Sequence, residues 1–396
     1  MTTATIPIQR RPDARLLVVG SGGRLCHSTR TGLPRHLYPG DVLVANDAAT
    51  IPASLRGVHE PSEELVEVRL AGRQSLRAED VRGFVAVVFG PGDFRTRTED
   101  RPPPPPLRVG DTLRLGPLRA TVTHLLDHPR LAVLRFSGDA DTIWAGIAAH
   151  GRPIQYAHVD RPLALWDVWT PIAALPAAFE PPSAGFVLDW SVIRTLAERD
   201  IDFATITHAA GISSTGDPVL DARLPFAEPY DVPAATVRAI ARARARGGRV
   251  VAVGTTVTRA LEHAATGTCR LRAGPGLATQ RIGPGTRLRV VDALITGVHE
   301  PGTSHYQLLG AFAPEDLLRR VDAAIEQHGY FPHEFGDAIL IEKQPPVDRH
   351  SVAVSALAES LVSLEPGCVA GAARGPLWPR RRTSITTYPA QSPNLP

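Results

Sequence analysis

One segment in the middle of the chain constrains the fold most, because it combines a buried strand, a glycine turn and the start of a helix. Residues 250–253 form a continuous apolar run, which is typical of a strand buried on both faces of a sheet. Gly254 ends the run, and Thr256 is expected to cap a helix that carries Arg259. Open α/β sheets bind ligands at the carboxyl ends of their strands, where helix N-termini offer backbone N–H groups. The segment therefore predicts an α/β sheet with a ligand site at Gly254, Thr255, Thr256 and Arg259, and the alternative is an ordinary strand-to-helix turn.

Length and composition limit the class of protein. The chain has 396 residues, enough for two domains, and 43% of them are hydrophobic. No apolar run approaches the roughly 18 residues of a membrane span, and residues 1–11 lack the apolar core of a signal peptide. We expect a cytoplasmic protein that works as a monomer and does not contact a membrane.

Charge and cysteine usage bear on partners and metals. The formal net charge of +3 permits nucleic-acid binding but does not demand it. The three cysteines, Cys26, Cys269 and Cys368, are far apart and form no C-x-x-C pair. This spacing argues against a disulfide framework and against a zinc site, so we expect no metal.

Two textures alternate along the chain. Residues 57–150 carry short strand-like runs broken by Gly, Pro and Asp, which predicts a small all-β barrel or sandwich. Within this block the proline-rich residues 101–106 are expected in a surface loop. Outside it, the periodicity predicts strands and helices of an α/β sheet, at residues 15–19, 41–45, 201–207 and 290–295 (strands) and 190–198, 234–246 and 314–327 (helices). Residues 344–396 are rich in Pro, Ser, Ala and Arg and are expected to form a disordered tail.

The glycine-rich residues 20–23 could indicate a dinucleotide-binding fingerprint. No helical pattern follows them, and residues 24–27 instead resemble a returning strand. A hairpin turn is therefore the preferred interpretation.

Candidate catalytic side chains follow the predicted strands. A base that works near neutral pH is most simply a histidine, and His208 and His299 each come just after a strand. Asp292 and Thr296 are four residues apart on one predicted strand and would face the same side, so Asp292 could orient a histidine or hold ribose hydroxyls. Asn46, at the end of another strand, could anchor an amide or a ribose. The alternative roles are packing for the histidines and a buried hydrogen-bond acceptor for Asp292.

Four segments also resemble motifs of one family in the same chain order. They are residues 40–46 (GDVLVAN) followed by IPA, residues 254–262 (GTTVTRALE), residues 291–296 (VDALIT) before His299, and residues 335–338 (FGDA). They are similar to GDLLVxN…IPAR, GTTSVRxLES, VDALxTNFHLP and YGDAM of the S-adenosylmethionine:tRNA ribosyltransferase-isomerases, enzymes of queuosine biosynthesis.

The resemblance implies a fold and an activity. The fold would be a discontinuous α/β main domain (residues 1–56 and 151–343) with the β-barrel domain (57–150) inserted. The activity would transfer the ribosyl moiety of S-adenosylmethionine (SAM) to a 7-aminomethyl-7-deazaguanine in tRNA and isomerise it, without a metal. The resemblance also implies SAM contacts for the Gly254–Arg259 segment, Asn46 and Thr296, catalytic roles for His208, His299 and Asp292, and substrate contacts for Glu228 and Asp337.

Some positions depart from the family motifs. The histidine of APTAGLHF is replaced by Val187, and both histidines of HxMHSE are lost around Ala222 and Phe226. Two alternatives therefore stay open beside the family activity: a diverged SAM-binding paralogue acting on a non-tRNA acceptor, and a non-catalytic binding protein.

Overall fold

The computed structural model describes residues 3–7, 11, 13–267 and 270–345. The expected tail lies outside the described residues from position 346 onward.

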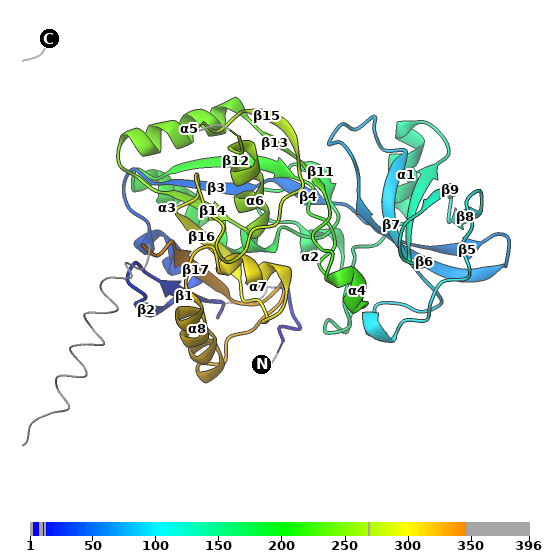
Figure 1. The fold of residues 1–396 in the computed structure, drawn as a ribbon, viewed down its shortest axis with the longest axis horizontal. Helices are drawn as coiled ribbons and strands as arrows, with labels where there is room; N and C mark the ends of the chain where they lie inside the picture. The colour runs from blue at the N-terminus through cyan, green and yellow to red at the C-terminus, as the bar shows by residue number, and fades with distance from the viewer. Residues whose placement is uncertain (1–2, 8–10, 12, 268–269, 346–396) are drawn as a thin grey trace, which may run out of the picture. The chain divides into compact units, whose positions relative to one another are not determined.

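A nine-stranded mixed sheet organises the α/β part (Figure 1). Four neighbouring strands in its middle run parallel, so their carboxyl ends meet at one edge. In spatial order the strands are β15 (Gly274–Ala278), β13 (Glu228–Val232), β12 (Asp202–His208), β3 (Val42–Asn46), β14 (Val250–Val253), β16 (Ala293–Gly297), β17 (Ala338–Glu342), β1 (Arg15–Val19) and β2 (Leu25–Thr29).

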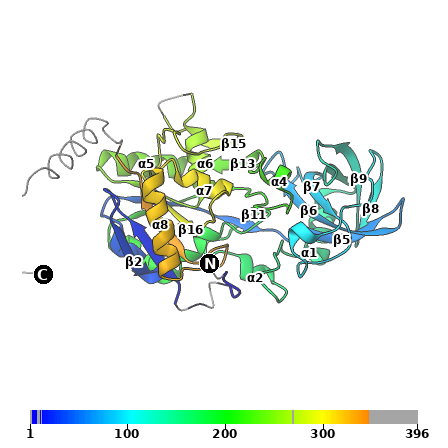
Figure 2. The ribbon, with the colours of Figure 1, turned by 60° about the horizontal axis from the view of Figure 1, so that its bottom comes forward.

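Apolar side chains cover both faces of this sheet, as expected for strands without polar alternation. On one face the strands pack against α5 (Ala234–Ala245), α6 (Thr255–Ala264), α7 (Ser304–Leu309) and α8 (Glu315–Gln327), which Figure 2 shows together. On the other face they pack against η2 (Arg30–His36), η4 (Ser183–Val187) and α3 (Trp190–Glu198). The apolar face of α8 is buried, with Leu317, Leu318, Val321 and Ile325 packed against the sheet.

Six antiparallel strands form a closed barrel with its own apolar core. In chain order they are β5 (Ser54–His59), β6 (Glu64–Gly72), β7 (Gly83–Phe89), β8 (Thr112–Leu115), β9 (Leu118–Leu125) and β10 (Leu131–Phe136), followed by α1 (Ala140–His150). The strands of the large sheet lie before and after the barrel in sequence, so the expected α/β fold with an inserted β-barrel is confirmed (Figure 1).

The barrel shows why sequence pattern missed its first strand. β5 contains Gly57, which suggests a break, but a Cβ at this position would lie 2.0 Å from the carbonyl oxygen of Arg114 in β8. Gly57 therefore lets two strands approach closely rather than ending one. The proline-rich stretch is irregular, as expected of a loop, but it is only partly exposed, because Arg101, Pro104 and Pro105 are buried and Arg101 bonds Glu67 of β6.

Short elements connect the two parts. Of these, β4 (Ala48–Thr50) and β11 (Leu175–Ala178) pair in parallel, and α2 (Leu165–Val168) precedes β11. Two further short elements lie within one part each: η3 (Thr98–Asp100) between barrel strands and α4 (Pro218–Asp221) between strands of the large sheet. The expected hairpin after β1 is confirmed, since β1 and β2 pair in antiparallel register.

Candidate active site

A cavity of about 360 Å³ lies at the edge where the parallel strands end. Its wall contains Gly254, Thr255, Thr256 and Arg259 from the turn after β14, and Thr296 and His299 from the end of β16. Loops after β12 and β11, helix α7 and the segment before β17 complete the wall. The prediction that the Gly254 turn faces a ligand-sized space agrees with this placement.

The turn after β14 differs from the expected cap. Gly254, not Thr256, is the N-cap of α6, and it has φ 105°, a left-handed conformation that favours glycine. Its N–H donates to the carbonyl of Ile295 at 2.8 Å, which ties the turn to β16. Among the described residues, the hydroxyls of Thr255 and Thr256 have no hydrogen-bond partner, and both residues line the cavity. The helix N-terminus therefore offers hydroxyls and backbone N–H groups to a ligand.

Arg259 and Glu228 form a buried ion pair in the cavity wall. Arg259 also donates to three backbone carbonyls, those of Gln280, Phe226 and Ala278. Glu228 accepts a further bond from the N–H of Gly211 at 2.6 Å. The Arg259 guanidinium thus holds β13, β15 and the following loop together, and few of its donors remain for a ligand.

His208 lies behind this ion pair rather than in the cavity wall. Its side chain is 0% exposed, and its Nε2 is 3.5 Å from the Glu228 carboxylate, too long for a good hydrogen bond. Burial lowers the pKa of His208 to about 4, although Glu228 acts in the opposite direction. In this structure His208 is a neutral packing residue that contacts Glu228.

His299 belongs to a cluster of imidazoles in the cavity. Its Nε2 is 2.7 Å from the Thr296 hydroxyl, and its ring stacks on that of His305 with centroids 4.9 Å apart. Burial, with His305 and His333 close by, lowers the pKa of His299 well below its usual value. His299 is therefore neutral near pH 7 and can accept a proton in the cavity.

Sequence reasoning missed a carboxyl group in the same cavity. Glu180 is buried, accepts a bond from the Tyr156 hydroxyl and accepts another from the N–H of Ser213 at 3.0 Å. Burial raises the pKa of Glu180 to about 7, against the lowering effect of these hydrogen bonds. Its position one residue before the Pro181–Pro182 motif was the available signal. His305, His333 and Glu334 line the cavity too and were also missed.

Besides His208, three more predicted site residues do not line the cavity. Asn46 is 2% exposed; its amide nitrogen donates to the carbonyl of His208, and its amide oxygen accepts from the N–H groups of Ala48 and His208. Asp337 is 1% exposed and accepts bonds from Arg11, Arg15 and Phe331.

Asp292 is the third, and the register explains its position. β16 begins at Ala293 rather than at residue 290, and Asp292 exchanges hydrogen bonds with the backbone N–H and C=O of Val250 at the start of β14. Thr296 is four residues further along, at about 3.3 Å per residue. The two side chains therefore lie at opposite ends of the strand, and only Thr296 reaches the cavity.

The departures from the family motifs lie outside the cavity wall. Val187 is buried in the apolar cluster under the sheet, and neither it, Ala222 nor Phe226 is among the described residues that line the cavity. The side chains now present at these three positions therefore contribute nothing to the cavity wall.

Two further observations concern partners. In the part of the chain that the structure describes, no group of three or more His, Cys, Asp or Glu side chains is arranged to hold a metal ion. No described helix combines the length and apolarity needed to cross a membrane.

The fold and the cavity define an α/β protein with a ligand-sized space at the carboxyl ends of its parallel strands and perturbed titratable groups facing that space, as is common in enzymes. Comparison with known proteins defines it further. Residues 1–341 match the family described as queuosine biosynthesis protein.

Similar curated proteins carry one name, S-adenosylmethionine:tRNA ribosyltransferase-isomerase. The protein from Moorella thermoacetica is 31% identical over 348 residues, covering 85% of this chain and 94% of the relative. The one from Sorangium cellulosum is 34% identical over 364 residues, with the same two coverages. The solved S-adenosylmethionine tRNA ribosyltransferase of Thermotoga maritima is 24% identical, with a TM-score of 0.45 over 86% of this chain and 96% of that one. The chain belongs to the queuosine biosynthesis protein family and is an enzyme of that family.

Proposed function

We propose that this enzyme transfers the ribosyl moiety of SAM to the aminomethyl group of a 7-aminomethyl-7-deazaguanine in tRNA and isomerises it, releasing adenine and methionine. The observation that carries the proposal is the cavity at the strand ends, which joins the N-terminus of α6 to a set of buried carboxyl and imidazole groups. The names of the similar proteins support the same reaction. Because tRNA is the proposed substrate, we place the protein in the cytoplasm.

The lining groups suit a cationic, hydroxyl-rich ligand. SAM carries a sulfonium and an ammonium group, and Glu180, Glu300 and Glu334 supply carboxyl groups to the cavity. The N–H groups and hydroxyls at Thr255 and Thr256 can bind a carboxylate or ribose oxygens. The residues present therefore fit SAM by charge and by hydrogen-bonding capacity.

We assign the proton-transfer roles from the pKa values and positions of the groups that line the cavity. A general base or acid works best when its pKa is near the operating pH, and Glu180, with a pKa of about 7, meets this condition. Neutral His299, held by Thr296, does not meet this condition, because its pKa lies well below the usual value; its ring is a weaker, second proton acceptor. We propose that Glu180 and His299, rather than His208 and Asp292, exchange protons with the substrate.

The test is incubation of the protein with SAM and unfractionated tRNA from cells that accumulate the aminomethyl-deazaguanine nucleoside. Mass spectrometry should find adenine and methionine in equal amounts, and a tRNA nucleoside enlarged by the isomerised ribosyl group. Release of adenine without a changed nucleoside would indicate a different acceptor, and no release would remove the activity.

A further inference from the structure

A second hollow of about 470 Å³ lies where the barrel meets the segment after α1. Apart from Leu163, its lining residues differ from those of the active-site cavity. Its floor is formed by the buried side chains of Ser54, Glu67 and Gln155, and its mouth by Arg56, Phe94, Arg95 and Arg152.

The two spaces share one wall. Along residues 153–156 the side chains alternate, as in an extended chain: Pro153 and Gln155 line the second hollow, whereas Ile154 and Tyr156 line the active-site cavity. Leu163 lines both. The two spaces are therefore neighbours on either side of one extended segment.

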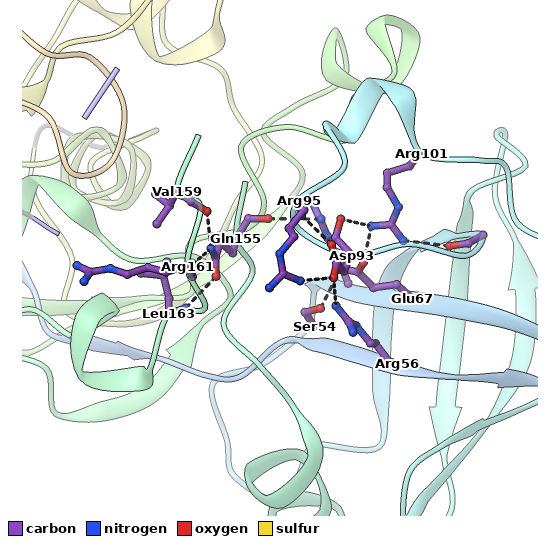
Figure 3. Close-up of polar contacts among 12 residues, drawn as sticks. Ser54, Arg56, Glu67, Asp93, Arg95, Arg101, Gln155, Val159, Arg161 and Leu163 are labelled. Atoms are coloured by element: carbon purple, nitrogen blue, oxygen red, sulfur yellow. Dashed lines mark hydrogen bonds and ion pairs between the residues drawn. The ribbon is translucent and has the colours of Figure 1, made fainter. Parts of the chain in front are cut away.

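Gln155 fixes this wall, as Figure 3 shows. Its amide nitrogen donates to the carbonyls of Val159 and Arg161, at 2.8 and 2.6 Å, and its oxygen accepts from the N–H of Leu163 at 2.9 Å. On the barrel side, the Arg69 guanidinium approaches the Gln155 carbonyl at 3.5 Å. The loop between the two spaces is thus held in one conformation by the barrel and by its own backbone.

Positive charge concentrates at the hollow. Asp93 draws two guanidinium groups together, at 2.9 Å from Arg95 and 3.4 Å from Arg56 (Figure 3). Both side chains stay more than half exposed, so most of their donors face solvent. Exposed Arg152 adds a third cation at the mouth.

The floor does not cancel this charge. Burial would raise the pKa of Glu67, but Arg69 and Arg101 hold it at about 2, so two cations surround one carboxylate. The carboxylates at the hollow are Glu67 and Asp93, and the cations are five arginines: Arg56, Arg69, Arg95, Arg101 and Arg152. Their sum is three positive charges, as many as the formal net charge of the whole chain. The hollow therefore attracts anions.

An aromatic ring accompanies the cations. Phe94 lines the hollow, and the Arg95 guanidinium lies over its ring at 4.8 Å from the centroid. Guanidinium groups for phosphates combined with aromatic and guanidinium planes for bases are the chemistry with which proteins bind single-stranded RNA.

We infer that this hollow binds the phosphodiester backbone of the RNA next to the reacting base, with Arg56, Arg95 and Arg152 as the phosphate ligands. The inference rests on the proposed function, because it takes the active-site substrate to be part of an RNA chain. An acidic protein segment could also pair with the three arginines. It has no bases to stack on Phe94, and nothing would link it to the neighbouring active-site cavity.

The experiment compares two triple variants of the full chain for binding to a fluorescein-labelled RNA stem–loop by anisotropy. One carries Arg56→Ala, Arg95→Ala and Arg152→Ala. The control carries Arg194→Ala, Arg238→Ala and Arg319→Ala, which remove the same charge from exposed positions on α3, α5 and α8. SAM binding by calorimetry, expected within about twofold of the intact chain for both variants, verifies that the fold is kept.

Loss of three phosphate contacts predicts a weaker affinity and a smaller salt dependence. The slope of log Kd against log salt should fall by about two, and Kd at low salt should rise by at least about tenfold, in the first variant only. Equal affinity and slope in the two variants would overturn the inference, as would equal weakening of an acidic peptide of matched charge.

The experiments distinguish failure of the proposed reaction from failure of the proposed RNA site. If the intact chain releases no adenine from SAM but its RNA binding depends on the three arginines, the hollow is an RNA site and the reaction is wrong. If tRNA is modified normally by the first variant at low RNA concentration, the reaction stands and the hollow is not its RNA site.

Discussion

Burial shifts the pKa values of individual side chains at and near the cavity in opposite directions. A buried carboxylic acid resists losing its proton and a buried imidazole resists gaining one, so Glu180 and His208 titrate far from their ordinary pKa values. Such groups link stability to pH, because the unfolded chain restores the ordinary values.

For Glu180 the folded-state pKa of about 7 lies above the ordinary 4.5. Its contribution to stability is full below pH 4.5 and is lost as the pH rises through 7. We expect the free energy of unfolding of the intact chain, relative to Glu180→Gln, to fall by about 2–3 kcal/mol between pH 5 and pH 8. Urea unfolding at the two pH values measures this difference. Relative to the control Glu315→Gln, at an exposed position on α8, the free energy of unfolding of the intact chain should not change with pH in this way. If the difference between the intact chain and Glu180→Gln is the same at pH 5 and pH 8, the raised pKa of Glu180 is contradicted.

For His208 the sign is reversed, because its folded-state pKa of about 4 lies below the ordinary 6.5. Its contribution is full above pH 6.5 and is lost as the pH falls through 4. Relative to His208→Gln, the intact chain should lose up to about 3 kcal/mol between pH 6.5 and pH 4. The same unfolding series extended to acid tests it, and an imidazole that titrates near 6.5 by NMR would refute the buried neutral state.

Sequence predicted the individual residues of the cavity unevenly. The Gly254 turn and His299 were found, because each follows a strand and matches a motif. Glu180 was not found, since its burial and its hydrogen bonds with Tyr156 and Ser213 depend on residues that are distant in sequence. Asn46 and Asp337 have the polar character of site residues, but their hydrogen bonds to backbone and arginine became visible only in three dimensions.

At the scale of elements, the turn from β14 to α6 carries two separable functions. Thr255 and Thr256 face the ligand space, whereas Arg259, one helical turn further on, is occupied by Glu228 and three carbonyls. A substitution at Thr256 should therefore change ligand affinity, whereas one at Arg259 should change the free energy of unfolding.

Thr256→Ala removes a hydroxyl without a partner in the described structure. We expect SAM binding by calorimetry to weaken by about 1–3 kcal/mol, the usual cost of losing a hydrogen bond to a charged ligand. The free energy of unfolding without ligand should change by less than about 0.5 kcal/mol, as for an exposed position. Unchanged SAM affinity would remove Thr256 from the site.

Arg259→Met instead leaves the Glu228 carboxylate buried without its cation. Breaking a buried pair in this way costs about 3–5 kcal/mol, so thermal or urea unfolding should show a large loss of stability. Arg319→Ala, whose partner Glu315 is exposed, should cost at most about 1 kcal/mol and serves as the control. A mild effect at Arg259 would mean that the pair adds little to the fold.

Element boundaries explain the one geometric error of consequence. The run 290–295 is apolar enough to be read as a strand, but β16 begins only at Ala293, so Asp292 stays at the amino end of the parallel strands. Hydrophobic pattern gives the existence of a strand more reliably than its first residue, and a site at one end of a sheet depends on that residue.

At the scale of the molecule, the residues that the structure describes pack apolar layers on both faces of the sheet and a separate core inside the barrel. Sequence texture separated the barrel from the sheet because short punctuated strands and long apolar strands differ in composition. It could not pair Arg101 with Glu67 or align residues 153–156 between two spaces, since both depend on contacts between distant parts of the chain.

The measurement that tests the central claim most directly is complementation of a strain that lacks the family enzyme. Expressed there, the protein should restore the nucleoside carrying the epoxycyclopentanediol, detected by mass spectrometry of digested tRNA. Glu180→Gln should restore less of it, and Arg319→Ala as much as the intact chain. Persistence of the 7-aminomethyl-7-deazaguanine nucleoside at its full level, with the protein expressed and folded, would contradict the proposed reaction.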